Sequence, residues 1–168
     1  LAVATARRGM IFNADGLDLN GWRTALEKSE LKASVDDVIA FVKERKPLNP
    51  VFVDCTASFD LPERYLDILS AGMSIATPNK RANSMKMEFY RALRSTANKM
   101  RRRFLYEANV GAGLPIIDTL QNLFKSGDRL TAFTGIMSGS LSYIFGRLDE
   151  GVAFSQAVLE AKEKNFTE

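Results

Sequence analysis

The sequence predicts an α/β protein: an incomplete parallel sheet with its helices, followed by the start of an α+β domain. Short apolar runs alternate with segments of helical periodicity, and the connections between them are short. The pattern changes after residue 106, where a glycine-containing turn leads into a different order of elements. We therefore assign residues 1–106 to a first domain and residues 107–168 to a second, truncated domain.

The first domain opens on an apolar run, residues 1–6, which predicts a strand and a chain that starts inside a fold. A short extended piece at residues 10–13 follows. Ser34 with Asp37 three residues later is typical of a capped helix start. Pro47 ends that helix, because proline cannot continue it.

Three further apolar runs are predicted as buried strands, with helices between them. Asp60 and Pro62 begin one helix, which Gly72 ends, and Ser84 is expected to cap another that runs to about Met100. The strands are residues 51–53, 73–76 and 104–106.

The second domain is predicted to contain three helices and one strand. Pro115 suits the first turn of a helix, and Ser138 and Ser155 are expected to cap two more. Residues 128–135 alternate in polarity, which predicts a strand.

Composition excludes several classes of protein. The 168 residues are 46% hydrophobic and 26% charged, with a net charge of +3, as in ordinary globular proteins. The basic cluster at residues 99–103 is interpreted as a solvated helix end, so no nucleic-acid partner is expected. No apolar run approaches the roughly 20 residues that span a bilayer, so no membrane partner is expected either.

Two residue types limit the chemistry further. With Cys55 as its one cysteine the chain can form no internal disulfide, which fits a reducing compartment. Histidine is absent, which excludes a Ser-His-Asp hydrolase, a Cys-His protease and a histidine-based zinc site within these residues.

Polar residues follow each of the three predicted strands of the first domain. Ligands of open parallel sheets bind beyond the carboxyl ends of the strands, so a shared cleft is expected there. Each of these residues also has a structural interpretation without a ligand. Thr56 and Ser58 could cap the next helix, and Lys80 could be a solvated charge in a loop. Cys55 is predicted to be a small buried apolar residue rather than a nucleophile. The polar segments are residues 54–58, 77–80 and 107–113.

A phosphate-binding fingerprint is missing. Gly111 and Gly113 tempt such an interpretation, but the third glycine position holds Ile116, so a tight turn or a ligand site remain equal alternatives. Glu107 beside this turn could help to hold a hard cation through oxygen atoms. Either the chain binds no dinucleotide, or its first βα unit is absent; the abrupt start favours the second.

Four motifs together resemble homoserine dehydrogenase over essentially the whole chain, most closely the dehydrogenase part of bacterial bifunctional aspartokinase–homoserine dehydrogenases. They are Val-Asp-Cys-Thr at 53–56, Ala-Thr-Pro-Asn-Lys at 76–80, Glu-Ala-Asn-Val-Gly-Ala-Gly-Leu-Pro at 107–115 and Ser-Gly-Ser-Leu-Ser-Tyr-Ile-Phe at 138–145.

The resemblance implies a Rossmann-type first domain and a substrate-binding and dimerisation domain after it. It also implies reversible NAD(P)H-dependent reduction of L-aspartate 4-semialdehyde to L-homoserine, in threonine and methionine biosynthesis. A cytoplasmic enzyme that forms a homo-oligomer through the substrate domain is expected.

The resemblance also implies roles for individual residues. Thr56 matches a cofactor contact, and Lys80 matches a lysine near the nicotinamide that shapes the electrostatics of catalysis. Gly139 and Ser140 match the substrate turn. Glu168 matches the glutamate that binds the substrate amino group, although Asn165 and Phe166 before it depart from the family pattern. A site for Na⁺ or K⁺ matches Glu107, Val110, Ala112 and Leu114.

Cofactor preference rests on two arginines. Arg7 and Arg8 follow the strand that in the family ends near the adenosine ribose, where guanidinium groups can pair with a 2′-phosphate. NADP(H) is therefore expected over NAD(H).

Parts of the family's active site are expected beyond these residues. The phosphate-binding loop would precede Leu1, and the catalytic lysine with its partner aspartates would follow Glu168, so the isolated fragment is expected to be inactive. Two alternatives stay open: a non-catalytic ligand-binding or interaction domain of the same fold, and another NAD(P)-dependent oxidoreductase acting on an amino-acid aldehyde.

Overall fold

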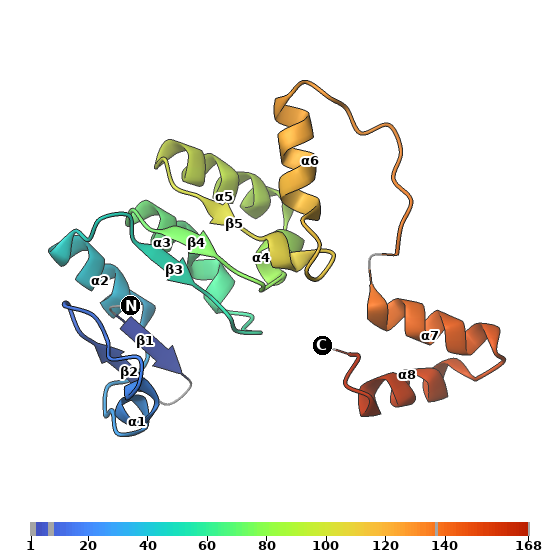
Figure 1. Cartoon of the computed structure of the whole chain (residues 1–168), viewed down its shortest axis with the longest axis horizontal. Coiled ribbons are helices and arrows are strands. Elements are labelled where there is room, and N and C mark those ends of the chain that lie inside the picture. Colours follow the sequence, from blue (N-terminus) through green and yellow to red (C-terminus); the bar gives the residue numbers. More distant parts are fainter. Residues whose placement is uncertain (1–2, 7–8, 137, 168) are drawn as a thin grey trace. The chain divides into compact units, whose positions relative to one another are not determined.

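The chain divides into two units, residues 1–109 and 110–168. Figure 1 labels their helices and strands. The computed structural model describes residues 9–136 and 138–167, and it describes the backbone of residues 3–6. Within this described part, no helix has the length and apolar character needed to cross a bilayer.

The first unit alternates strands and helices, as expected of an α/β protein. Its elements are, in order, β1 (Val3–Ala6), β2 (Gly9–Phe12), α1 (Trp22–Glu27), α2 (Val35–Arg45), β3 (Val51–Val53), the 3₁₀ turn η1 (Leu61–Arg64), α3 (Tyr65–Ser70), β4 (Ser74–Ala76), α4 (Arg81–Ser84), α5 (Met87–Lys99), β5 (Phe104–Leu105) and the 3₁₀ turn η2 (Glu107–Asn109).

Two separate sheets are present in this unit. β3, β4 and β5 form a parallel sheet in the order β3-β4-β5, which confirms the predicted class. The strands expected near residues 1–6 and 10–13 also exist as β1 and β2, but they pair with each other as an antiparallel hairpin.

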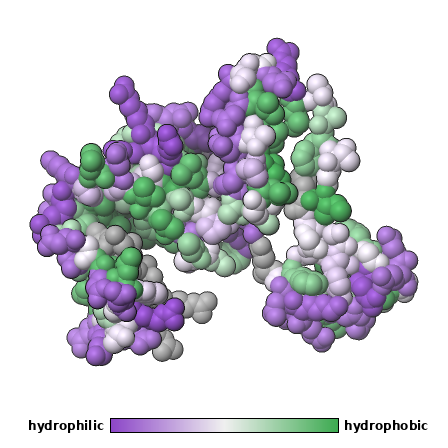
Figure 2. Space-filling view, viewed as in Figure 1, coloured by the Kyte–Doolittle hydropathy of each residue, from purple (hydrophilic) through white to green (hydrophobic). Residues whose placement is uncertain are grey.

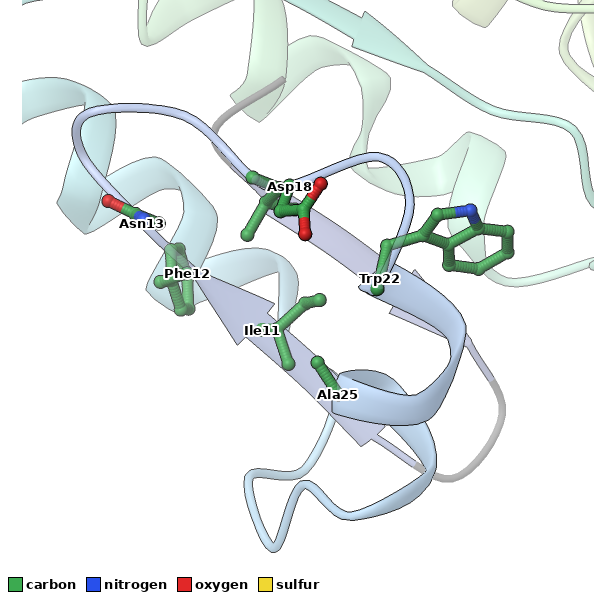
Figure 3. A pocket seen from close by; sticks show the side chains of 8 residues that line it. Ile11, Phe12, Asn13, Asp18, Trp22 and Ala25 are labelled. Carbon is green, nitrogen blue, oxygen red and sulfur yellow. The ribbon is translucent and has the colours of Figure 1, made fainter.

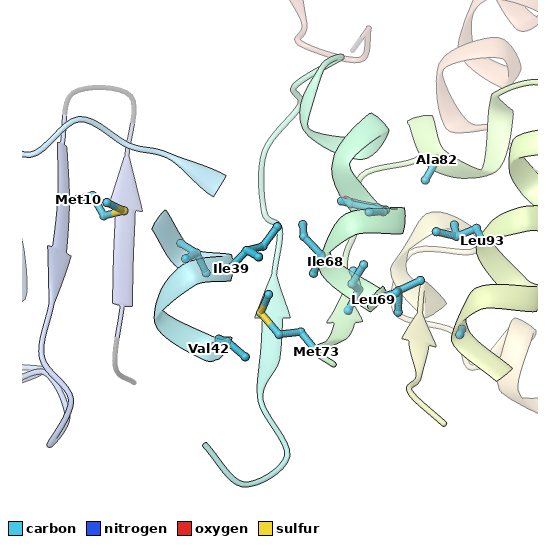
Figure 4. Close-up of a cluster of buried hydrophobic side chains, with 12 residues drawn as sticks. Met10, Ile39, Val42, Ile68, Leu69, Met73, Ala82 and Leu93 are labelled. Atoms are coloured by element: carbon cyan, nitrogen blue, oxygen red, sulfur yellow. The ribbon is translucent and has the colours of Figure 1, made fainter. Parts of the chain in front are cut away.

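One face of the parallel sheet packs into the core of the unit. Because side chains alternate along a strand, Phe52, Ile75 and Phe104 lie on the same face. They pack with Leu69 of α3 and Leu93 of α5, both labelled in Figure 4. Ile75, Leu69 and Leu93 are completely buried. The helices are therefore fixed to the sheet by apolar burial, the main stabilising term in folding.

The opposite face of the sheet corrects the expectation of fully buried strands. Val51, Val53 and Leu105 share that face and are 56%, 63% and 49% exposed. Figure 2 shows hydrophobic residues gathered over these strands. Apolar runs are typical of strands covered on both faces, whereas this sheet is packed on one face.

Of the helix caps predicted for this unit, Ser34 is confirmed and Ser84 is wrong. Ser34 caps α2, its Oγ accepting from the Asp37 amide at 3.2 Å. Ser84 is not the expected cap: its hydroxyl donates to the carbonyl oxygens of Lys80 and Arg81. Bonds of this kind satisfy the end of α4, and extended backbone at Met85 separates α4 from α5.

The second unit is helical in its described residues. Ser138 caps α7 as expected, accepting from the Leu141 amide at 3.2 Å, but α8 begins after Ala153, with Ser155 inside its first turn. Residues 128–135 form no strand, which contradicts the expectation. The helices are α6 (Ile116–Lys125), α7 (Gly139–Asp149) and α8 (Phe154–Glu163).

Helices α7 and α8 pack as a pair. Ile144, Ala157 and Ala161 form their buried contact. Beside it, the Arg147 guanidinium donates to Glu160 across the two helices, with Nε at 2.8 Å from Oε2. The ion pair lowers the pKa of Glu160.

Shortening Leu93 should destabilise the first unit. Leu93→Ala is expected to lower the free energy of unfolding by about 3 kcal/mol, because it removes buried contacts and leaves a cavity. Leu48→Ala is the matched control, since Leu48 is 92% exposed and should change stability by less than about 0.5 kcal/mol. Urea denaturation measures both, and equal losses would show that Leu93 is not part of the core.

Candidate functional site

The carboxyl ends of three neighbouring strands meet at one edge of the parallel sheet. β3 is followed by Asp54, β4 by Thr77, and β5 by Tyr106 and Glu107. Parallel pairing places these ends side by side. This is the edge at which open α/β sheets bind ligands.

Asp54 is the centre of a buried hydrogen-bond network at this edge. Its side chain is 1% exposed. Oδ2 accepts from the Tyr65 hydroxyl at 2.5 Å and from the Asn79 amide nitrogen at 3.3 Å, and Oδ1 accepts from the Thr56 backbone N–H at 2.7 Å. The carboxylate therefore ties the loop after β3 to the loop after β4 and to α3.

Thr77 and Asn79 complete the network from β4. The Thr77 hydroxyl donates to the Asp54 carbonyl oxygen at 2.9 Å and accepts from the Asn79 backbone N–H at 2.9 Å. The Asn79 side chain also donates to the Ser58 carbonyl oxygen at 3.0 Å. Both residues are 5% exposed, so these bonds are shielded from water and fix the two loops firmly.

The two predicted cofactor residues lie next to this buried network. Thr56 and Lys80 are exposed, and each lies next to a loop segment fixed by Asp54 or Asn79. The Ser58 hydroxyl accepts from the Leu61 backbone N–H at 3.2 Å, but the N-cap residue of η1 is Asp60, whose side chain makes no capping bond. Cys55 is exposed, so its predicted burial is wrong.

A stacked pair also bridges the same two loops on the surface. The guanidinium carbon of Arg81 lies 3.4 Å from the centre of the Phe59 ring. Phe59 follows β3 and Arg81 begins α4, so this cation–π contact joins the loops above the buried network. Arg81 and Lys80 thus place two cationic side chains at the edge that also holds Asp54 and Glu107.

The turn after β5 contains the predicted cation residues. Glu107 is half-buried in η2 and belongs to the first unit, while Val110, Ala112 and Leu114 belong to the second. Gly111 has φ +75°, a conformation that strains residues with a side chain, and an added Cβ would displace the Ile116 side chain, so glycine is favoured there. The role of these residues in binding a cation stays a prediction.

Ser140 of the predicted substrate turn contacts the segment that follows α8. The Ser140 hydroxyl at the start of α7 donates to the carbonyl oxygen of Phe166. The Phe166 ring packs edge-on against Tyr143, with centroids 5.1 Å apart. Phe166 therefore lies beside Ser140 and Tyr143. Arg7, Arg8 and Glu168 themselves lie outside the described residues.

A hollow of about 360 Å³ lies elsewhere in the first unit, between β2 and α1 (Figure 3). It is mostly apolar, and it contains none of the site residues expected from the sequence. Its lining includes Ile11, Phe12, Asp18, Trp22 and Ala25.

The buried network should make stability depend on alkaline pH. Burial, with the hydrogen bond to Asp54, raises the pKa of the Tyr65 hydroxyl. The folded state therefore holds this proton more tightly than the unfolded chain, whose tyrosines titrate near pH 10. The stabilisation is complete below about pH 10 and is lost as pH rises through the folded pKa. Urea denaturation at pH 9 to 12 should show a steeper loss for the wild type than for Tyr65→Phe; parallel losses would contradict this.

Several residues of the site were not identified from the sequence. The sequence marks Asp54 only as one of several polar residues after a strand, and it places Tyr65 inside the helix predicted to begin at Asp60 and Pro62. A carboxylate directly after an apolar strand is a signal that could have singled out Asp54, because an acidic group there requires buried donors. Nothing in the sequence indicated that Tyr65 supplies one of them.

Known proteins resemble this chain over its whole length. The family model described as "Homoserine dehydrogenase, NAD binding domain" matches residues 3–107, and the model "Homoserine dehydrogenase" matches residues 115–168. A bifunctional aspartokinase/homoserine dehydrogenase of Haemophilus influenzae is 44% identical over 99% of this chain and 20% of its own length. A homoserine dehydrogenase of Schizosaccharomyces pombe is 36% identical over 90% of this chain and 42% of its own length.

Solved structures agree. A hyperthermophilic archaeal homoserine dehydrogenase in complex with NADPH superimposes with a TM-score of 0.73 at 26% identity, covering 99% of this chain and 52% of its own. A Candida auris protein of unknown function reaches a TM-score of 0.81 at 32% identity, covering 98% of this chain and 47% of its own. The chain thus spans about a fifth of the bifunctional relative and about half of these solved chains. Because the family models match both units in order, the chain belongs to the homoserine dehydrogenase family.

Proposed function

We propose that this chain forms the nicotinamide-binding edge of a homoserine dehydrogenase, which reduces L-aspartate 4-semialdehyde to L-homoserine with NAD(P)H. One observation carries the proposal: the buried Asp54 network fixes the loops that present Thr56 and Lys80 at a single sheet edge. The first unit would bind the cofactor, and the second would begin the substrate domain.

The donor groups at this edge suit a nicotinamide nucleotide. The exposed Thr56 hydroxyl can hydrogen-bond to a ribose or carboxamide, and the Lys80 and Arg81 cations suit a ligand that carries phosphates. When bound, the cofactor supplies the hydride. The NADPH complex of the archaeal relative supports this ligand class.

Lys80 would contribute electrostatics to the reaction. The carbonyl oxygen of the semialdehyde gains negative charge as the hydride arrives, and a nearby ammonium group stabilises that charge. We assign protonation of the oxygen to the downstream lysine that the family resemblance implies. Asp54 would orient Thr56 and the Lys80 loop without contacting the reacting atoms.

Further roles are proposed for the second unit and the turn before it. Glu107, with the carbonyl oxygens of Val110, Ala112 and Leu114, would hold Na⁺ or K⁺. Gly139, Ser140 and Glu168 would bind the substrate. A homo-oligomer formed through the second unit, in the cytoplasm, remains a prediction.

Steady-state assays of the full-length protein test the proposed function. NADPH oxidation that depends on L-aspartate 4-semialdehyde, and homoserine-dependent reduction of NADP⁺, are the expected results. Other amino-acid semialdehydes should be poorer substrates. Tight NADPH binding without either reaction would instead identify a ligand-binding domain, and turnover of a different aldehyde would identify another oxidoreductase.

Cofactor preference gives a separate prediction. If Arg7 and Arg8 pair with the 2′-phosphate, kcat/KM with NADPH should exceed that with NADH by about tenfold or more, because charge-assisted contacts are lost with NADH. Replacing both arginines with alanine should remove most of this difference. Equal efficiency of the wild type with the two cofactors would reject the role of these arginines.

A further inference from the structure

The side chain of Asn109 joins the loop before Lys80 to the turn that contains Glu107. We assign its amide orientation from the neighbouring groups: with the nitrogen toward the carbonyl oxygens of Thr77 and Pro78 it donates to them at 3.0 Å and 3.1 Å, and the amide oxygen accepts from the Asn83 side chain at 2.8 Å. Its backbone N–H donates to the Tyr106 carbonyl oxygen at 3.0 Å. The amide nitrogen, the amide oxygen and the backbone N–H of Asn109 therefore all make hydrogen bonds.

The contact continues into α5. The Asn83 side-chain oxygen accepts from Nη2 of Arg94 at 3.1 Å. The Arg94 guanidinium lies 3.3 Å from the centre of the Tyr90 ring and 5.1 Å from that of Tyr106. The chain of contacts Arg94–Asn83–Asn109 is therefore anchored on aromatic rings at one end and on two loop carbonyls at the other.

These bonds connect the loop of Thr77 and Pro78 to the turn that contains Glu107. Asn109 does not belong to the hydrophobic core cluster. Pro78 lies two residues before Lys80, and Asn109 lies two residues after Glu107 in the same 3₁₀ turn. A shift of the Asn109 side chain would move the backbone of both segments together. Thr77 also bonds to the Asp54 backbone, so the same chain of contacts reaches the loop of Thr56.

We propose that Asn109 is a positioning residue that holds the Lys80 loop and the Glu107 turn in one arrangement, so that cofactor binding and cation binding are coupled. The inference rests on the proposed function, in which Lys80 serves the cofactor and Glu107 a monovalent cation. Residues that orient binding groups from behind are typically worth about tenfold or more in affinity or activity.

Substitutions at Asn109 and Asn83 test this in the full-length protein. Asn109→Ala loses all three side-chain bonds, while Asn109→Asp keeps the acceptor for Asn83 but turns an oxygen toward the two carbonyls. Asn83→Ala removes the donor to the Asn109 amide oxygen and, with it, the link to Arg94, but it keeps the two bonds from Asn109 to the loop carbonyls. Asn98→Ala is the matched control, because Asn98 is an exposed asparagine on α5. Each variant is measured for NADPH dissociation constant, half-saturating Na⁺ or K⁺ concentration, kcat and Tm.

We expect Asn109→Ala to weaken NADPH binding by about tenfold and to raise the half-saturating cation concentration by a similar factor. Asn109→Asp should be affected at least as strongly, Asn83→Ala less, and Asn98→Ala not at all. Hydrogen exchange should accelerate in residues 77–81 and 107–111 together in the Asn109 variants that fold.

Three results would overturn the inference. The first is a lower Tm in Asn109→Ala and Asn109→Asp with unchanged NADPH and cation affinities, which would make Asn109 purely structural. The second is a change in one affinity without the other. The third is a wild type whose activity does not respond to monovalent cations. A wild type without dehydrogenase activity would instead reject the proposed function, while the NADPH-binding and exchange measurements on Asn109 would still be informative.

Discussion

Replacing Lys80 with alanine should lower kcat/KM of the full-length protein by about a hundredfold, because removing one positioned electrostatic group from an active site has effects of this size. Lys80 is exposed at the edge where the three strands end, so the substitution should leave Tm nearly unchanged. Steady-state kinetics with NADPH and L-aspartate 4-semialdehyde measure the loss.

Two further variants show whether the effect belongs to the position or to the charge. Lys80→Arg keeps the charge but not the compact ammonium group, so it should recover activity only in part. Lys99→Ala removes an exposed lysine at the far end of α5 and should have full activity. If Lys80→Ala turned over as fast as the wild type with unchanged NADPH affinity, Lys80 would not belong to the site.

Replacing Asp54 with alanine should have the largest effect on stability at this edge. The change removes the carboxylate that accepts from the Tyr65 hydroxyl, the Asn79 amide and the Thr56 N–H, and it leaves only the Tyr65 bond to Thr77 and the Asn79 bond to Ser58. Buried donors without partners are costly, and we expect a loss of about 3 kcal/mol in the free energy of unfolding. Urea denaturation measures this loss, and NADPH affinity should fall with it because Thr56 and the Lys80 loop lose their common support.

Two further variants distinguish the effect of losing the hydrogen-bond network from the effect of losing a negative charge. Asp54→Asn keeps one acceptor oxygen and should lose less stability than Asp54→Ala. Asp60→Ala removes an exposed carboxylate near the same loop and should change stability by less than about 0.5 kcal/mol. A loss for Asp54→Ala no larger than for Asp60→Ala would mean that the network contributes little.

The order of strands and helices in the first unit was predictable from the sequence because local patterns determine it. Short apolar runs gave β3, β4 and β5, and Ser34 with Asp37 gave the start of α2. The meeting of the strand ends also followed, since parallel strands share one carboxyl edge. Sequence alone therefore predicted that Thr56 and Lys80 follow neighbouring strand ends.

Burial was less predictable because it depends on what covers each face. Val51 and Val53 have the composition of buried strand residues, yet they are more than half exposed. Residues 128–135 alternate in polarity like a strand, but extended backbone is stable only when another strand pairs with it. Ser84 was misassigned for a related reason, since its hydroxyl had a choice between capping α5 and bonding back to α4.

The supporting residues of the site depend on contacts between distant parts of the chain. Tyr65 lies 11 residues after Asp54, and Asn79 lies 25 after it. Asn109 meets the loop of Thr77 and Pro78 only because β5 pairs with β4. Motifs identify the residues that contact ligands, whereas the residues that hold them are identified only by the fold.

The most direct test of the central claim is a structure of the full-length protein with NADP⁺ bound. We predict that the nicotinamide half of the cofactor lies over the carboxyl ends of β3, β4 and β5, within hydrogen-bonding distance of Thr56 or Lys80. Density for the cofactor at another surface, such as the hollow between β2 and α1, would contradict the assignment of this edge.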